Sequence, residues 1–187
     1  MAGDRAEKTR LMDRASAGDE AAFADLAGRM QDDLFRFALA QGLCPADAAE
    51  TVQEALLRAW QRRGTWWAGS DAAAWLYGIA MNVVRELWRH RRRRGADRAD
   101  LDLFAARPDA GGPDSAADLA RLTAHVAALP PRQREAVACR YLRGMSVRET
   151  AAAMGCAEGT VKAAVFAALK NLRKAMARRN EAAMGPV

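Results

Sequence analysis

Arginines are concentrated in one stretch of the chain, where six of the ten residues from Arg85 to Arg94 are arginine and only Glu86 is acidic. One or two basic residues at a helix end complement the helix dipole, but that effect does not account for six. Two adjacent tryptophans, Trp66 and Trp67, precede this stretch in a segment bounded by glycines. Guanidinium groups bind phosphates, and indole faces stack on bases. These residue types suit contact with nucleic acid, although the tryptophans could equally cover an alanine-rich core.

Residues that could support catalysis or bind a metal ion are few. The two histidines are His90, beside the arginines, and His125, which an amphipathic pattern places at a surface or rim. No carboxylate cluster or nucleophile–base pair accompanies them, so we expect no catalytic residue and no enzyme acting on nucleic acid. The three cysteines, Cys44, Cys139 and Cys156, are odd in number and far apart. They predict free thiols, no metal site, no cofactor and a reducing, cytoplasmic compartment.

The composition predicts an all-α chain. Its 187 residues are rich in Ala, Leu, Arg and Met, contain few β-branched residues, and have hardly any alternating apolar–polar run. The net charge of +6 indicates an anionic partner. No apolar run approaches the length that crosses a bilayer, so we expect no membrane insertion.

Apolar residues at helical spacing predict a helix that begins after Gly18, where Asp19 caps the first amides, and ends near Gly42. Another helix is expected from about Ala72 into the arginine stretch. The inward positions of these two helices are Phe23, Leu26, Met30, Leu34 and Phe37 in the first, and Trp75, Leu76, Ile79, Val83 and Leu87 in the second. Both helices therefore bury one face.

Between these two helices, Pro45 and Asp47 open a further helix with a polar outer face of mixed charge. Its inward positions are expected to be Ala49, Val52, Leu56, and Ala59 or Trp60. Its outer face includes Glu50, Gln53 and Glu54.

The C-terminal half contains a capped pair of helices. Ser146 and Glu149 have capping-box spacing, in which each side chain accepts a hydrogen bond from the backbone N–H of the other residue. Gly155 supplies the helix stop, and a second helix begins near Glu158. The outer face of that second helix is basic. A short capped helix, a glycine turn and a basic helix form the pattern of a helix-turn-helix, whose second helix enters the major groove of DNA.

A change in composition separates the two halves. From Gly95 to Asp118 the chain has six aspartates against two arginines and few sizeable apolar residues, which is typical of a linker. Two small helical domains are therefore expected, at about 10–94 and 119–177, joined by an acidic flexible linker at 95–118. The linker lies between two basic surfaces, and it could mask either of them at low salt.

Several motifs in one order make the pattern specific. The C-terminal motifs are Ala128–Glu135, Arg140–Ser146, Glu149–Gly155 and Glu158–Lys162, and the N-terminal motifs are Gly18–Phe23, Val52–Trp60 and Ala74–Asn82. The first set resembles the fourth region, and the second set the second region, of extracytoplasmic-function (ECF) sigma factors of the sigma-70 family. The resemblance covers nearly the whole chain except its ends and the linker.

This resemblance implies a transcription initiation factor that binds core RNA polymerase and directs it to promoters. It implies that the N-terminal domain opens the strands and that the helix-turn-helix reads duplex DNA, with an anti-sigma factor as a further partner. Core-polymerase contacts are expected from Glu50, Gln53 and Glu54. Contacts with the downstream promoter element are expected from Arg63, Trp66, Trp67, Trp75, Asn82, Arg85, Arg89, Arg91, Arg92 and Arg93. Contacts with the upstream element are expected from Arg148, Thr160, Lys162, Phe166, Lys170 and Arg173.

Some positions depart from the family pattern. Ala163, Ala164 and Ala167 stand where relatives often carry polar or basic residues, so readout depends more on the remaining polar positions. Phe166 either touches a thymine methyl group or is buried. The alternative to a sigma factor is a stand-alone helix-turn-helix regulator, which would leave the polar helix face at 50–54 and the arginine-tipped helix unexplained.

Overall fold

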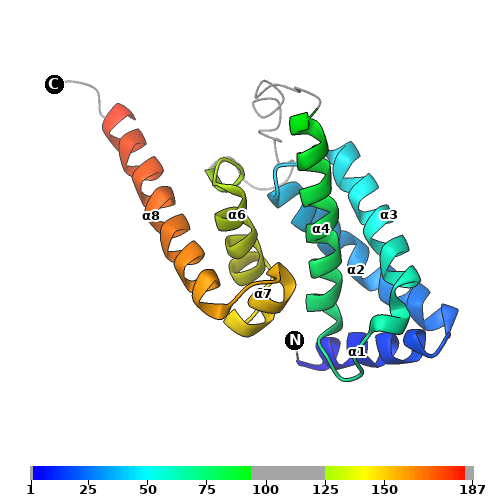
Figure 1. Ribbon diagram of the computed structural model, residues 1–187. Coiled ribbons are helices and arrows are strands. Elements are labelled where there is room, and N and C mark those ends of the chain that lie inside the picture. Colours follow the sequence, from blue (N-terminus) through cyan, green and yellow to red (C-terminus); the bar gives the residue numbers. More distant parts are fainter. Residues whose placement is uncertain (1, 94–124, 184–187) are drawn as a thin grey trace.

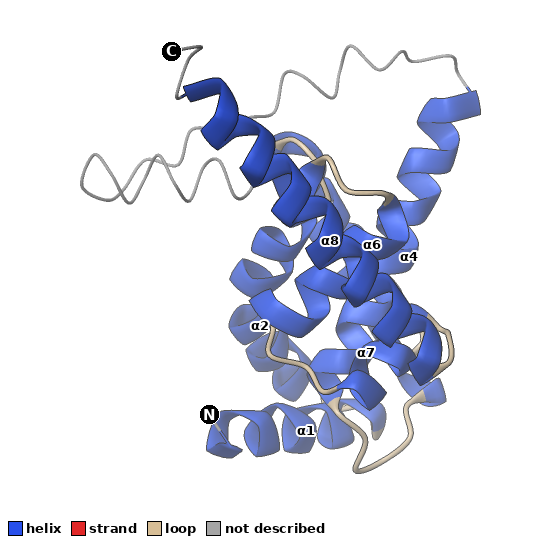
Figure 2. Ribbon diagram, turned by 90° about the vertical axis from the view of Figure 1, so that its left-hand side faces the viewer, coloured by secondary structure: helices blue, strands red, loops and turns tan. Residues whose placement is uncertain are grey.

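The computed structural model describes residues 2–93 and 125–183, and the regular structure in these ranges is helical throughout (Figures 1 and 2). The all-α prediction is therefore confirmed. The predicted linker and Arg94 lie outside the described residues. The elements are α1 (Ala2–Ser16), α2 (Glu20–Ala40), α3 (Pro45–Gln61), the short helix η1 (Arg63–Thr65), α4 (Ala72–Arg93), α6 (Pro131–Val137), the π-helical turn η3 (Ala138–Leu142), α7 (Val147–Met154) and α8 (Glu158–Ala183).

Helices α2, α3 and α4 form an N-terminal bundle around a well-packed core. The Asp19 carboxylate accepts a hydrogen bond from the Ala22 N–H at 2.9 Å, which confirms the predicted cap of α2. Four of the five residues predicted to point inward from α2 are fully buried; Phe23 is partly buried and its ring packs on Trp60 at 5.2 Å. These four residues are Leu26, Met30, Leu34 and Phe37.

The predicted register of α3 is wrong at one position. Ala49 is exposed, whereas Ala48 and Ala55 are buried together with Val52 and Ala59. The helix begins at Pro45 as expected, but Cys44 caps it by accepting from the Asp47 N–H at 3.3 Å. Adjacent alanines differ little in size or polarity, so apolar spacing could not decide which of them faces the core.

Helix α1 was not predicted from the sequence, because most of its residues are polar or charged. It buries only a short apolar edge formed by Leu11, Met12 and Ala15, which packs against the bundle. Figure 1 shows α1 lying across the end of the bundle where α4 begins. This position brings α1 close to the segment that joins α3 to α4.

In the C-terminal unit, the starts of α7 and α8 and the end of α7 lie where the sequence indicates. The Ser146 hydroxyl accepts from the Glu149 N–H at 3.2 Å, and the Glu149 carboxylate accepts from the Ser146 N–H at 2.8 Å, so the capping box is confirmed. Gly155 ends α7 with a positive φ of 62°. Helix α8 begins at Glu158 as predicted and continues to Ala183.

The two units pack directly against each other. Helices α6 and α7 lie between α8 and the N-terminal bundle, and α7 contacts α4 (Figure 1). Gly78 of α4 permits this close approach, because a Cβ atom there would lie 3.3 Å from the Ala153 carbonyl oxygen. One continuous apolar cluster includes Tyr77 and Met81 of α4 together with Met154 of α7.

Within the described ranges, none of the helices is individually long and apolar enough to span a membrane. The bent pair of α7 and α8, with an angle of 100° between its helices, meets the criterion on length and composition alone.

Candidate nucleic-acid interface

The two adjacent tryptophans have opposite environments. The Trp66 side chain is 9% exposed, its indole N–H donates to Asp13 at 2.7 Å, and its ring meets Trp75 edge-on with centroids 5.6 Å apart. The Trp67 side chain is 81% exposed. The sequence left stacking and core packing open for both residues, and the structure divides the two roles. Only Trp67 presents a free indole face of the kind that stacks on an unpaired base.

The outer face of α4 carries Asn82, Arg85 and Arg89, but these residues are not equally free. Asn82 and Arg89 are exposed. The Arg85 guanidinium donates to both carboxylate oxygens of Glu135 on α6, at 2.8 and 2.7 Å, and to the Met154 carbonyl oxygen at 3.2 Å. The hydrogen bond with Glu135 raises the pKa of Arg85. One predicted DNA contact is thus paired within the protein.

The arginines at the end of α4 also differ from one another. Arg92 and Arg93 are exposed, whereas the Arg91 guanidinium donates to Asp47 of α3 at 2.5 Å. Burial raises the pKa of Asp47, but hydrogen bonds from Cys44 and Arg91 outweigh burial and leave it below its ordinary value. Arg91 therefore joins α4 to α3, and the free charge of this helix end lies on its neighbours.

Arg63 begins the short helix η1 and lies over the indole of Trp60, with 3.9 Å between the guanidinium carbon and the ring centroid. It also donates to the Trp60 carbonyl oxygen at 2.8 Å. Its side chain is half-buried in this arrangement. A guanidinium stacked on an indole keeps its outer edge available for a phosphate.

The basic face of α8 is exposed to solvent between Thr160 and Arg173. Val161 and Ala168 bury the opposite side of the helix, and Phe166 is 73% exposed, so the interpretation of Phe166 as a buried residue is wrong. The predicted contact residues exposed on this face are Thr160, Lys162, Phe166, Lys170 and Arg173, and the sixth predicted contact, Arg148, is exposed on α7. This face has the shape and charge of a helix that enters a major groove.

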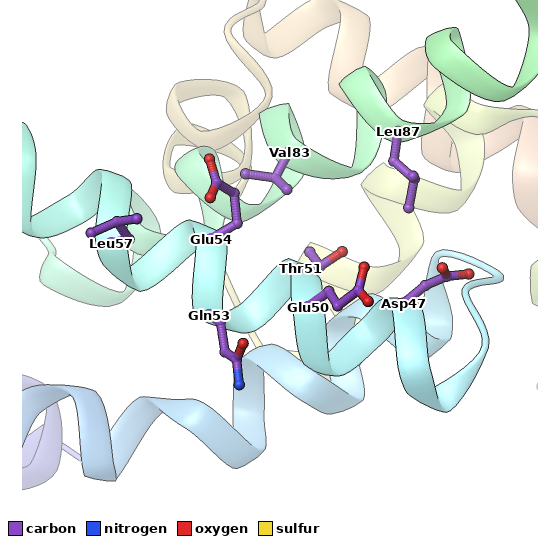
Figure 3. Close-up of a pocket in the computed structure, with 8 residues that line it drawn as sticks. All are labelled: Asp47, Glu50, Thr51, Gln53, Glu54, Leu57, Val83 and Leu87. Atoms are coloured by element: carbon purple, nitrogen blue, oxygen red, sulfur yellow. The ribbon is translucent and has the colours of Figure 1, made fainter.

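A third surface lies between α3 and α4. Glu50, Gln53 and Glu54, the predicted polymerase contacts, line a groove of about 420 Å³ (Figure 3). Its other lining residues include Leu57, which is half exposed, and Leu87. The groove therefore combines apolar surface with a row of acidic and amide groups, as protein-binding surfaces commonly do.

Ion pairs connect the two helices that form this groove. Arg58 of α3 donates to Glu54 on the same helix at 2.6 Å and to Glu86 of α4 at 2.6 Å. These ion pairs hold the helices that form the walls, whereas Glu50 and Gln53 remain exposed.

Sequence patterns missed several residues that the structure brings to these surfaces. Asp13 of α1 contacts the tryptophan segment, and Glu135 of α6 pairs with Arg85. Arg5 of α1 forms ion pairs with both Asp71 and Glu149, so it connects the N-terminal bundle to the capping box of α7. Local sequence patterns could not predict these contacts, because the partners are far apart in the chain.

Groups of three or more His, Cys, Asp or Glu residues that could hold a metal ion do not occur in the described part of the chain. Cys44, Cys139 and Cys156 are free, and burial raises the pKa of the Cys139 thiol to about 12. His90 is exposed and His125 is half-buried, which agrees with the expected surface or rim position of His125.

Comparison with known families finds two matches that together cover both helical units. Residues 26–94 match the family model of sigma-70 region 2, and residues 119–172 match that of sigma-70 region 4. The chain carries both regions in the order that the motifs indicated.

The chain is similar to proteins named ECF RNA polymerase sigma factors over most of its own length. The chain is 34% identical over 176 residues to the ECF RNA polymerase sigma factor BldN of Streptomyces coelicolor, covering 91% of this chain and 66% of that protein. It is 33% identical over 172 residues to the ECF RNA polymerase sigma factor SigF of Caulobacter vibrioides, covering 90% of this chain and 93% of that protein.

Solved structures include a similar arrangement. The sigma factor RpoE of Bartonella quintana, crystallised with the anti-sigma factor NepR, matches with a TM-score of 0.65 and 28% identity. The match covers 81% of this chain and 94% of that chain. The two family regions, the near-complete match to SigF and the shared fold together establish that this chain belongs to the ECF sigma factors of the sigma-70 family.

Proposed function

We propose that this chain is a transcription initiation factor that binds core RNA polymerase and directs it to specific promoters. The observation that carries the proposal is the presence of both sigma-70 regions in one chain. Sigma factors act as binding subunits of the polymerase, so the chain contributes recognition and strand opening, while the polymerase supplies the catalytic centre.

The groove between α3 and α4 is the proposed docking surface for core polymerase. Glu50, Gln53 and Glu54 line it, and half-exposed Leu57 supplies an apolar anchor beside them. An apolar centre with a polar rim supports specific binding of a partner protein. The cross-links from Arg58 keep both walls of the groove in place before the partner arrives.

The two DNA elements are assigned to different helices. We assign the upstream element, in duplex form, to the exposed face of α8, where Lys162 and Phe166 are central. We assign the downstream element to the segment that contains Trp67 and to α4, where Asn82 is exposed. Opening the strands requires capture of an unstacked base and neutralisation of the backbone, and indole and guanidinium groups serve these two purposes.

An anti-sigma factor is the proposed regulatory partner. The similar RpoE of Bartonella quintana was solved with the anti-sigma factor NepR. In this chain the two units already pack together through α4 and α7, so one inhibitor could contact both of them at once.

The test is transcription with purified full chain and bacterial core polymerase on a genomic DNA library. We expect the chain to bind core polymerase in a pull-down and to direct initiation at a limited set of start sites. Glu50→Ala with Gln53→Ala should weaken polymerase binding, whereas Glu20→Ala, an exposed acidic change on α2, serves as the matched control. Tight binding to duplex DNA without any association with polymerase would instead favour a stand-alone regulator. That alternative leaves the match to sigma-70 region 2 unexplained.

A further inference from the structure

Helix α1 makes several polar contacts with the segment between α3 and α4. The Thr9 hydroxyl donates to the Ser70 carbonyl oxygen at 3.2 Å, and Arg5 pairs with Asp71. Asp13 accepts from the Trp66 indole at 2.7 Å. The α1 helix therefore contacts this segment at successive points, although neither α1 nor its contacts were predicted from the sequence.

Asp13 is the central contact because one oxygen atom, Oδ1, accepts two hydrogen bonds. The first comes from the Trp66 indole N–H at 2.7 Å, and the second comes from the Gly69 backbone N–H at 3.3 Å. These donors stand immediately before and after Trp67 and Ala68. The carboxylate therefore ties together both ends of a two-residue segment whose exposed side chain is an indole.

The local backbone and packing place Trp66 toward the core and Trp67 toward solvent. Gly69 has a φ of 77°, which glycine adopts without strain, and it turns the chain back toward α1. Trp66 is held inward by its hydrogen bond to Asp13 and by its edge-on contact with Trp75. With Trp66 held inward, the side chain of the next residue points to solvent, in agreement with the exposure of Trp67.

We propose that Asp13 is a positioning residue for promoter opening, and that it holds the segment 66–69 so that Trp67 presents its indole face to an unpaired DNA base. This inference rests on the proposed function, because it assigns to α1 a part in the strand opening by the N-terminal unit. Asp13 does not contact DNA in this proposal. It acts through Trp66 and Gly69, and preorganisation of a stacking face removes the entropy cost of ordering that face when the base arrives.

The test compares opening rates for the full chain bound to core polymerase, on a promoter selected with the wild-type complex and carrying 2-aminopurine in its downstream element. Asp13→Ala removes the acceptor of both hydrogen bonds and should lower the opening rate at least about tenfold, which is the lower end of the scale for hydrogen bonds to a charged acceptor. Asp13→Asn retains a carbonyl oxygen as acceptor and should restore most of the rate. Asp4→Ala removes another α1 carboxylate, which pairs only with Lys8 within the described contacts, and should match the wild type.

A second variant separates positioning from a simple loss of folding. Trp66→Phe retains an aromatic ring in the core but removes the N–H group and leaves the Gly69 hydrogen bond in place, so it should slow opening by no more than Asp13→Ala does. The double variant should be little slower than Asp13→Ala alone, because the hydrogen bond that Trp66→Phe removes is one of the two that Asp13→Ala already removes. All variants should bind core polymerase as the wild type does.

The possible results are distinguishable. Wild-type rates for Asp13→Ala, failure of Asp13→Asn to recover the rate, or additive effects of the two changes would each overturn the positioning role and leave the proposed function intact. A wild-type complex that opened no promoter at all would overturn both proposals together.

Discussion

The two surfaces expected to meet DNA differ in how far the protein itself already occupies them. On α8 the predicted contact residues are exposed from Thr160 to Arg173. On α4, Arg85 is paired with Glu135 and Arg91 with Asp47. The upstream surface can therefore meet a major groove without changing its own side-chain contacts, whereas Arg85 must exchange a carboxylate for a phosphate.

The physical reason lies in what each helix packs against. Helix α8 uses one side for α6 and α7 and leaves the other side to solvent. Helix α4 packs against the rest of its own bundle and also against α7, so part of its outer face lies within the contact between the two units. The downstream surface is therefore coupled to the packing of the C-terminal unit against the bundle, whereas the exposed face of α8 lies outside that contact.

The largest expected effect comes from removing Glu135. Its side chain is 5% exposed, and Glu135→Ala leaves Arg85 without its bidentate partner. Breaking a buried ion pair by deleting one member should weaken the packing of the two units by about 3 kcal/mol. Small-angle X-ray scattering should show a larger radius of gyration, and Glu20→Ala, at an exposed position of α2, is the control. An unchanged radius would mean that apolar packing alone holds the units together.

A smaller effect is expected at the open surface. Lys162→Ala and Phe166→Ala should each reduce discrimination between the correct and an altered upstream element by about 1–2 kcal/mol, because base-edge contacts carry sequence information. Gel-shift titration of the polymerase complex on matched promoters measures this loss. Polymerase binding should not change, and a loss of that binding would show that the two units have been assigned the wrong roles.

The free and paired arginines of α4 allow a direct comparison. Replacing Arg92 and Arg93 by alanine should lower the slope of log affinity against log salt by about two, because each arginine would neutralise one DNA phosphate. Arg91→Ala should change the slope less per residue, because Arg91 already pairs with Asp47. The measurement is promoter affinity of the polymerase complex across a salt series. Equal effects per residue would mean that Arg91 leaves Asp47 when DNA binds.

The smallest effect concerns Glu149, which receives hydrogen bonds from Arg5 and from the Ser146 N–H. Burial raises the pKa of Glu149, but these hydrogen bonds dominate and hold it below its ordinary value. Its contribution to stability is therefore fully present above the ordinary glutamate pKa of about 4.3 and is lost as pH falls through the lower folded value.

Glu149→Gln retains an acceptor for the capping box and removes the charge. We expect the wild type to be more stable than this variant by less than about 1 kcal/mol near neutral pH, with the difference shrinking at acidic pH. Urea unfolding of both proteins at several pH values gives the difference. A gap that widened on acidification would contradict the stabilising role of the carboxylate.

Local signals explain which parts of the fold were predictable. The cap at Asp19, the capping box of Ser146 and Glu149, and the stop at Gly155 each depend on residues within a few positions of one another. Their chemistry operates wherever the helix lies. For that reason these particular helix starts and ends could be read from the sequence with little knowledge of tertiary structure.

Most features that the sequence did not predict, or left undecided, depend on neighbours distant in sequence. Helix α1 has too few apolar residues for their spacing to predict a helix, and it is stabilised by packing across the end of the bundle. The burial of Trp66 beside an exposed Trp67 depends on the hydrogen bond to Asp13, which only the tertiary structure brings close to them. The error at Ala49 arose because small residues give a weak apolar contrast.

The amino-acid sequence was sufficient to predict the family and the helical class, because both follow from ordered motifs and short-range spacing. The three groups of contact residues, which the family resemblance implies, stay predictions. Only the tertiary structure decided which of those residues are free. Arg85, Arg91 and Trp66 are engaged within the protein, whereas Trp67 and the α8 face are not. The reason is that the pairing of a charge or an indole depends on what other segments bring within hydrogen-bonding distance, and linear spacing carries no record of that distance.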